Sequence, residues 1–232
     1  MSDDYLFSLP QPFIAIQGNG KRFPVRRVWC VGRNYAAHAR ELGNDAKDPP
    51  FFFSKQPDMV VPMSSNQKDG GTIRYPSLTS NYHFECELVV ALKEGGQNVS
   101  VEDAPKLIFG HAVGLDMTRR DLQKQMQEKG RPWEIGKSFE QSAPIGPLTP
   151  AMGPLPHGRI RLTVNGQVKQ ESDTGLMMWN EAEIISKLSQ QVRLSAGDVI
   201  FTGTPEGVGP VKPGDQLLAE VAGLEPLSVT IA

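Results

Sequence analysis

Two acidic residues within an apolar strand constrain this chain more than any other feature. Residues 82–90 are mostly aromatic and β-branched, which predicts a β-strand. Since side chains alternate along a strand, Glu85 and Glu87 are expected on one face, beside His83. The other face carries candidate core residues, Phe84, Cys86, Leu88 and Val90.

These carboxylates have two interpretations. Two carboxylates on one face repel each other and resist desolvation, and a divalent cation between them relieves both problems. Asp116 follows a short apolar run and offers a third acid. Three carboxylates without a Cys/His ligand pair favour Mg²⁺ or Mn²⁺ over zinc. The alternative is a half-exposed strand with solvated acids. The spacing of the two glutamates does not decide between these, whereas the apolar flanks favour the metal.

Composition limits the classes of protein. The chain has 232 residues, 39% hydrophobic and 22% charged, so it can bury a sizeable core. Its net charge of -2 and the absence of a basic run argue against nucleic-acid binding. We find no signal peptide and no membrane-length apolar run, and we expect a cytoplasmic protein without a membrane partner. Cys30 and Cys86 are expected to be reduced core thiols.

Turn residues predict one β-rich domain with peripheral helices. A hairpin is expected around residues 18–20, and a second around Asn165–Gly166, the strongest hairpin signal in the chain. Residues 216–221 and 227–231 are expected to form two closing strands.

Helices are expected at two strong capping signals. Thr118 with Asp121 resembles a capping box and predicts a helix from Thr118 to Lys129. Asn180 with Glu183 predicts a second, amphipathic helix. A short helix is also expected over residues 101–109, a loop leading to a strand over 132–139, and an exposed loop over 64–72.

A histidine and a lysine are further candidates for chemistry. His38 and Glu41 lie three apart on a predicted short helix and therefore share a face. A carboxylate beside an imidazole raises its basicity, which suits water activation, although this segment alone favours an ordinary polar face of a capped surface helix. Lys137 stands in a mixed apolar segment and is either an anion-binding group or a solvated lysine.

The glycine-rich residues 203–209 have three interpretations. They lack the Gly-Lys-Ser/Thr ending of a phosphate-binding loop, and their spacing does not fit a dinucleotide fingerprint. A sharp structural loop remains, as does a loop whose Thr202 and Thr204 face a ligand. No Gly-x-Ser-x-Gly elbow is present, and neither cysteine has a histidine partner nearby in sequence. A metal with a general base is therefore favoured over covalent catalysis.

Several motifs, taken together and in order, resemble the fumarylacetoacetate hydrolase family, specifically its short acylpyruvase branch. They are VGRNYAAH at 31–38, FFFSK at 51–55, HFECEL at 83–88, GLDMTRRD at 114–121, PW at 132–133, GKSF at 136–139 and TGTPEGVG at 202–209. The resemblance implies a β-rich α+β fold with a mixed β-roll/β-sandwich core, short peripheral helices and assembly as a homodimer. Residues 1–24 would form a short N-terminal segment with a hairpin, and residues 25–232 a single catalytic domain.

The resemblance also implies roles for individual residues. Glu85, Glu87 and Asp116 would ligate one divalent cation, Mg²⁺ or Mn²⁺, which Ca²⁺ can replace in crystals. The water-activating pair would be His38 and Glu41. Substrate orientation and oxyanion stabilisation fall to Lys137 and Gln123. Substrate contacts are expected from Arg120 and Thr204, and a distal substrate carboxylate would pair with Arg33, Arg119 or Arg131.

The implied reaction is hydrolysis of a carbon–carbon bond in a small 2,4-diketo acid. Fumarylpyruvate, cleaved to fumarate and pyruvate, is the preferred substrate, because residues 118–121 and 130–134 look closest to the gentisate-pathway enzymes of aromatic catabolism. The short N-terminal segment argues against fumarylacetoacetate itself. Oxaloacetate decarboxylation and hydroxymuconate-type isomerisation are alternatives on the same scaffold. A non-catalytic, metal-stabilised binding protein is the alternative from another class.

Overall fold

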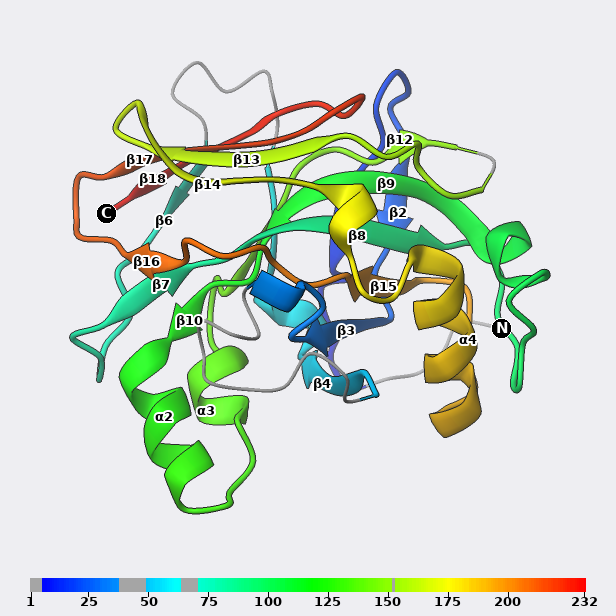
Figure 1. Ribbon diagram of the computed structural model, residues 1–232, viewed down its shortest axis with the longest axis horizontal. Helices are drawn as coiled ribbons and strands as arrows, with labels where there is room; N and C mark the ends of the chain where they lie inside the picture. The colour runs from blue at the N-terminus through cyan, green and yellow to red at the C-terminus, as the bar shows by residue number, and fades with distance from the viewer. Residues whose placement is uncertain (1–5, 38–48, 64–70, 152) are drawn as a thin grey trace.

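A mixed sheet runs through the centre of the fold (Figure 1). The computed structural model of the protein describes residues 6–37, 49–63, 71–151 and 153–232. In spatial order the sheet contains β4 (Phe51–Lys55), β3 (Arg27–Gly32), β15 (Asp198–Phe201), β8 (Cys86–Leu92), β9 (Ile108–Leu115), β11 (Ala143–Ile145) and β5 (Val60–Pro62), with β12 (Thr149–Pro150) beside β9. Every residue of β8 is buried, so this strand forms the interior of the molecule.

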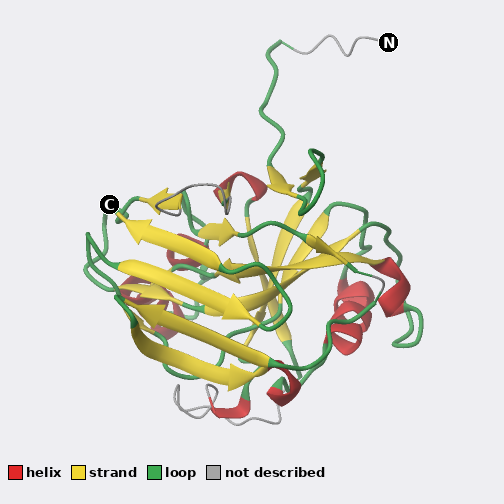
Figure 2. Cartoon of the chain, turned by 90° about the horizontal axis from the view of Figure 1, so that it is seen from above, coloured by secondary structure: helices red, strands yellow, loops and turns green. Residues whose placement is uncertain are grey.

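A second sheet packs against the first. It contains β14 (Gln167–Asp173), β13 (Arg159–Val164), β17 (Gln216–Val221), β18 (Leu227–Ile231) and β6 (Gly71–Ile73). Side chains from both sheets share one apolar core, in which Leu88 and Val113 of the central sheet meet Leu162, Leu217 and Val229 of the second. Figure 2 shows the two layers with the short helices outside them. This arrangement confirms the predicted β-rich fold with a mixed roll and sandwich core.

Both predicted hairpins are present. β1 (Phe13–Ala15) pairs antiparallel with β2 (Arg22–Pro24). β13 and β14 are joined at Asn165–Gly166, where φ is 51° and 77°. Positive φ at both central residues is the geometry of a type I′ turn, which only residues such as asparagine and glycine adopt readily.

The expected single strand over residues 82–90 is instead two strands that meet at Glu85. β7 (Tyr82–Phe84) belongs to a small sheet with β10 (Thr118–Arg119) and β16 (Gly209–Pro210), whereas β8 lies in the central sheet. At the junction the Cys86 N–H donates to the Gln170 side chain at 3.0 Å rather than to a neighbouring strand. The acidic residues therefore sit where the chain passes from one sheet to another.

The predicted capping box at Thr118 is wrong. α2 (Arg120–Glu128) begins two residues later and has no side-chain cap. The Thr118 hydroxyl donates instead to the Asp116 carbonyl at 3.1 Å. The Asp121 carboxylate accepts from the Thr79 hydroxyl at 2.5 Å. Tertiary partners have replaced the local cap that the sequence pattern predicts.

Three other expectations need correction. Residues 132–139 contain a short helix, α3 (Glu134–Lys137), rather than a loop leading to a strand. It packs closely on α2, since a Cβ added at Gly136 would lie 2.8 Å from the Gln123 backbone nitrogen. Within 101–109 there is only the 3₁₀ turn η2 (Ala104–Leu107), and β9 then begins at Ile108. Residues 71–72 belong to β6 rather than to an exposed loop.

The remaining elements lie at the periphery. These are α4 (Glu181–Gln191) and the 3₁₀ turns η1 (Pro57–Met59) and η3 (Thr174–Leu176). α4 buries Ile184, Ile185 and Leu188 against the central sheet, as its predicted apolar stripe requires. In the part of the chain that the structure describes, no helix is both long and apolar enough to cross a membrane.

The predicted capping box of α4 is confirmed, and its contribution to stability is measurable. The Asn180 side chain accepts from the Glu183 N–H at 3.0 Å, and the Glu183 carboxylate accepts from the Asn180 N–H at 2.9 Å. We expect Asn180→Ala to lower the free energy of unfolding by about 1 kcal/mol. Urea denaturation measures this. Asn180→Asp, which keeps a capping oxygen, should stay close to wild type, and equal losses in both variants would contradict the capping role.

Candidate metal centre and active site

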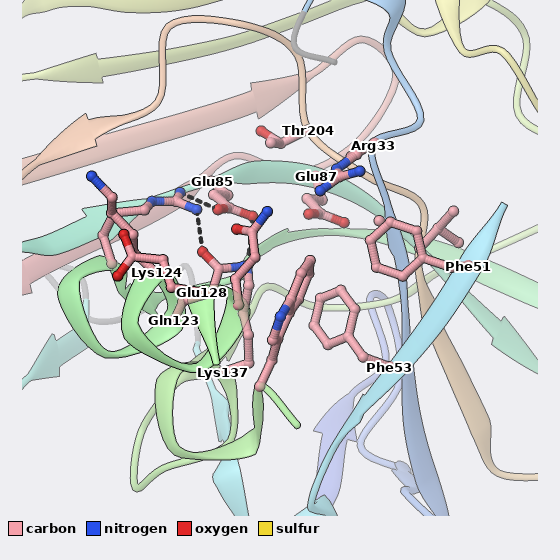
Figure 3. A pocket seen from close by; sticks show the side chains of 15 residues that line it. Arg33, Phe51, Phe53, Glu85, Glu87, Gln123, Lys124, Glu128, Lys137 and Thr204 are labelled. Carbon is pink, nitrogen blue, oxygen red and sulfur yellow. Dashed lines mark hydrogen bonds and ion pairs between the residues drawn. The ribbon is translucent and has the colours of Figure 1, made fainter. Parts of the chain in front are cut away.

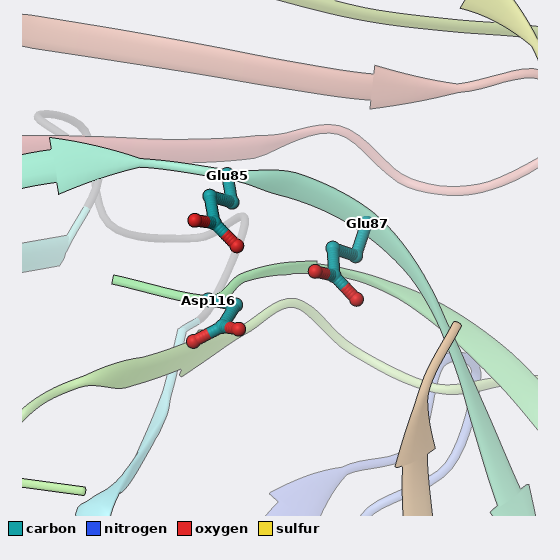
Figure 4. Close-up of side chains that lie close together, drawn as sticks. All are labelled: Glu85, Glu87 and Asp116. Atoms are coloured by element: carbon teal, nitrogen blue, oxygen red, sulfur yellow. The ribbon is translucent and has the colours of Figure 1, made fainter. Parts of the chain in front are cut away.

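Three buried carboxylates converge beside the junction of β7 and β8 (Figure 4). Glu85, Glu87 and Asp116 are 5%, 2% and 0% exposed. Each offers one carboxylate oxygen, and these oxygens all lie within 4.8 Å of one another. The register of β8 on β9, with Glu87 opposite Gly114, brings Asp116 at the end of β9 next to the two glutamates. The structure thus brings together the three acids that the sequence singled out.

Two buried lysines and an arginine lie against this acidic cluster. Lys137 Nζ is 2.8 Å from Glu85 Oε2 and 2.7 Å from Asp116 Oδ2. Lys55 Nζ is 2.8 Å from Asp116 Oδ1, and Arg120 forms an ion pair with Glu85. Burial alone would lower the pKa of Lys137, but the carboxylates of Asp116 and Glu85 outweigh it and the pKa is raised. Lys137 is therefore charged, and it neutralises part of the cluster.

Glu87 is the acid whose charge is least compensated. Its Oε2 accepts the Gly203 N–H at 2.6 Å, and it forms no ion pair with any residue that the structure describes. Burial, together with the carboxylates of Asp116 and Glu85, raises the pKa of Glu87 well above its ordinary value. A divalent cation among the three acids would remove this penalty. The all-oxygen donor set fits a hard ion such as Mg²⁺ or Mn²⁺.

Glu85 and Glu87 line a cavity of ≈ 620 Å³, and the fully buried Asp116 lies next to them (Figures 3 and 4). Among its lining residues α2 contributes Arg120, Gln123 and Lys124, which share one side of the helix. The Arg120 guanidinium donates to Gln123 Oε1 at 2.6 Å, which fixes the orientation of that amide. Thr204 lines the cavity from the loop that follows β15. This volume suits a small organic acid.

The three arginines considered as partners of a distal substrate carboxylate differ in whether they line the cavity. Arg33 lines the cavity and lies over the Phe51 ring, 5.4 Å from its centroid. Arg119 does not line the cavity, because it is buried over the Phe139 ring, 4.2 Å from the centroid. Arg131 follows α2, is exposed and is also absent from the lining. Of these three arginines, only Arg33 therefore remains a candidate for pairing with a distal substrate carboxylate.

The predicted water-activating pair, His38 and Glu41, lies outside the described residues and stays a prediction. The chain that leads to it is anchored at Asn34, whose side-chain amide donates to the carbonyls of Trp179 and Thr202 at 2.9 and 2.8 Å. This segment is therefore tied to the loop that carries Thr204.

The fold agrees with comparisons against known proteins. Residues 27–232 match the family model described as fumarylacetoacetate (FAA) hydrolase C-terminal. The chain belongs to the fumarylacetoacetate hydrolase family. The crystal structure of fumarylpyruvate hydrolase from Pseudomonas aeruginosa in complex with Mn²⁺ and pyruvate matches with a TM-score of 0.95 and 51% identity, covering 99% of each chain.

Two curated relatives in this family carry different activities in their names. Fumarylpyruvate hydrolase of Ralstonia sp is 46% identical over 182 residues, which cover 78% of this chain and 92% of the relative. Oxaloacetate tautomerase FAHD1, mitochondrial, of Bos taurus is 39% identical over 210 residues, which cover 87% of this chain and 92% of the relative. The family and its hydrolase members identify the chain as an enzyme that hydrolyses carbon–carbon bonds.

Sequence reasoning missed two groups that support the site. Lys55 ends the apolar strand β4, where a buried lysine requires a counter-ion, so its position was a usable signal. Gln170 gave no such signal, because it lies on β14, the second strand of an ordinary hairpin. Its buried amide donates to Thr204 Oγ1 at 2.8 Å and accepts the Cys86 N–H at 3.0 Å, which links the Thr204 loop to the strand between the two glutamates.

Proposed function

We propose that this enzyme hydrolyses fumarylpyruvate to fumarate and pyruvate with the help of one divalent cation, Mg²⁺ or Mn²⁺. The observation that carries this proposal is the cluster of Glu85, Glu87 and Asp116 at the cavity. Its support is the 51% identical Pseudomonas aeruginosa fumarylpyruvate hydrolase, whose structure contains Mn²⁺ and pyruvate. Those three acids would hold the cation. When bound, the cation supplies a Lewis acid that stabilises negative charge on the pyruvyl fragment.

The cleavage needs a base, which we assign to His38 with Glu41 on the family resemblance. His38 removes a proton from water, and the resulting hydroxide adds to the carbonyl carbon of the acyl tail. The bond between that carbon and the methylene of the pyruvyl fragment then breaks. Its electron pair remains on the pyruvyl fragment, which takes up a proton and leaves as pyruvate. The tail leaves as a carboxylate.

Lys137 and Gln123 are the expected donors to the developing oxyanion. The ammonium of Lys137 has three acceptors, of which the Thr118 hydroxyl at 2.8 Å is the only uncharged one. If the oxyanion replaces the Thr118 hydroxyl, one N–H of Lys137 donates to the oxyanion while the other two keep their bonds to Glu85 and Asp116. Gln123 accepts from Arg120 through its oxygen, which leaves its NH₂ group to donate to substrate.

The fumaryl carboxylate requires a cationic partner in the cavity. Arg33 and Lys124 both line it, and Figure 3 places them on opposite sides. Arg120 lines the cavity as well, but it is ion-paired with Glu85. We assign the distal carboxylate to one of these two side chains.

A second candidate function is keto–enol exchange on oxaloacetate. The 39% identical Bos taurus tautomerase favours it, because this relative covers most of the chain. Oxaloacetate presents the same adjacent carboxylate and keto oxygen as fumarylpyruvate. The two activities therefore differ in what happens at the far end of the substrate.

A substrate panel separates these functions. Purified protein with Mg²⁺ or Mn²⁺ is assayed on fumarylpyruvate, acetylpyruvate and oxaloacetate, with products identified by chromatography. We expect the highest kcat/KM for fumarylpyruvate, and fumarate and pyruvate in equal amounts. A clear preference for acetylpyruvate, or tautomerisation of oxaloacetate without cleavage of either acylpyruvate, would contradict the proposal.

We further propose that residues 25–232 act as a single catalytic domain and that the enzyme is a homodimer. Sedimentation equilibrium of the purified protein measures the assembly directly.

A further inference from the structure

One side of the cavity is built from three aromatic rings. Phe51 and Phe53 come from β4 and Trp133 immediately precedes α3, and all three line the cavity. The Trp133 ring meets the Phe51 ring edge-on, with centroids 5.3 Å apart and planes at 88°. The Phe53 and Trp133 centroids are 6.0 Å apart at 57°. We refer to Phe51, Phe53 and Trp133 as the aromatic wall. The mechanism proposed above makes no use of it.

The aromatic wall is held in place and adjoins the acidic cluster. A Cβ added at Gly32 would lie 2.0 Å from the Phe51 ring, so this ring packs directly on the backbone of β3. Lys137 Nζ lies 5.2 Å from the centroid of the Phe53 ring. Figure 3 shows Phe51 and Phe53 side by side, across the cavity from Lys124. A substrate whose pyruvyl end meets the acids would therefore extend its acyl tail beside these rings.

We propose that the aromatic wall makes the enzyme selective for acylpyruvates with a planar, conjugated tail, and that aroylpyruvates are accordingly substrates as well. This inference rests on the proposed function. Aromatic rings gain attraction beyond simple burial when a second π-system lies against them face to face with an offset, or edge to face. A saturated tail is not flat and cannot make these contacts over its whole length. For benzoylpyruvate, water would add to the benzoyl carbonyl carbon, and the same carbon–carbon bond would break to give benzoate and pyruvate.

The kinetic test compares fumarylpyruvate with succinylpyruvate, which has the same charges and chain length but a saturated tail. Conjugation also changes the reactivity of the carbonyl, so the informative quantity is the change in the ratio of kcat/KM values between variants. We expect Trp133→Leu to lower the fumaryl-to-succinyl ratio by about 5–10-fold, mainly through KM. Trp133→Phe, which restores a ring, should recover most of the ratio. Trp179→Leu removes a tryptophan outside the cavity lining and should leave the ratio at its wild-type value.

A binding test gives a readout that does not depend on turnover. Benzylidenepyruvate and 2-oxo-4-phenylbutanoate have the same carbon skeleton, one planar and one saturated, and both lack the second ketone that cleavage requires. Titration calorimetry on the Mn²⁺-loaded protein should show tighter binding of the planar acid to wild type. We expect Trp133→Leu to reduce this preference by a similar 5–10-fold.

The outcomes separate this inference from the proposed function. Turnover of fumarylpyruvate with benzoylpyruvate inert, or with the same fumaryl-to-succinyl ratio in wild type and Trp133→Leu, would overturn the aromatic-wall inference and leave the proposed function standing. No turnover of any acylpyruvate would remove the proposed function. In that case the calorimetric comparison still decides whether the wall selects planar tails.

Discussion

Replacing Glu87 by glutamine is expected to stabilise the metal-free protein while it weakens metal binding at least about 100-fold. The two effects have one cause. Glu87 is 2% exposed, forms no ion pair with any described residue and has a pKa raised by burial and by the neighbouring acids. Glutamine has the same shape, and its side-chain oxygen still accepts the Gly203 N–H. It removes the buried charge and, with it, one ligand.

The gain in stability depends on pH in a defined direction. The pKa of Glu87 is raised above its ordinary value of 4.5, so ionisation favours the unfolded chain. In the metal-free protein, neutral Glu87 contributes fully to the free energy of unfolding below about pH 4.5, the pKa expected in the unfolded chain. This contribution is lost as the pH rises through the raised pKa of the folded protein. Glu87→Gln should therefore be more stable than wild type once the pH lies above the raised pKa of Glu87.

Three measurements check the Glu87 prediction. Urea denaturation with EDTA at several pH values gives the stability difference, Mn²⁺ titration gives the dissociation constant, and steady-state kinetics should show at least about a 100-fold fall in kcat/KM. Glu171→Gln on β14 is the matched control, because Glu171 is an exposed acid and should change none of these quantities. A Glu87→Gln protein that is less stable without metal, or that binds Mn²⁺ as wild type does, would contradict the account.

Replacing Lys137 by methionine should have the opposite effect on the metal-free protein. Its ammonium lies within 2.8 Å of both Glu85 and Asp116, and methionine fills similar space without the charge. Removal of one partner from a buried ionic cluster typically costs about 3–5 kcal/mol. A divalent cation takes over part of the lost neutralisation, so added Mn²⁺ should restore more stability to Lys137→Met than to wild type.

The same substitution should slow catalysis after metal has been added. Loss of one oxyanion donor typically lowers kcat by about 100–1,000-fold. Urea denaturation with and without Mn²⁺ measures the first effect, and kcat at saturating Mn²⁺ measures the second. Lys93→Met is the control, because Lys93 is exposed at the end of β8. Wild-type stability in EDTA together with wild-type kcat would show that Lys137 has neither role.

The sequence predicted those elements of the fold whose position depends on their own residues and flanking turns. The predicted closing strands, 216–221 and 227–231, coincide with β17 and β18, since alternating residues and flanking turns define them without help from elsewhere. The turn at Asn165–Gly166 likewise depends on its own backbone conformation. The three acids were identified for a related reason, because buried carboxylates are costly wherever the strand is placed.

Partners distant in the sequence explain most of the corrections. The strand break at Glu85 depends on Gln170, which satisfies the Cys86 N–H from 84 residues away. α3 is four residues long, and its position depends on close packing of Gly136 against α2, which no window of sequence reveals. Lys55 illustrates a different limit: its burial follows from the strand it ends, but its partner Asp116 is known only from the assembled fold.

We propose that Glu85, Glu87 and Asp116 together hold one divalent cation beside the cavity. Crystals grown with Mn²⁺ and pyruvate, measured at the manganese absorption edge, test it most directly. We expect a single anomalous peak within coordination distance of one oxygen from each acid, and loss of that peak in Glu87→Gln. A wild-type anomalous map without a peak among these three side chains, in crystals of active enzyme, would contradict it.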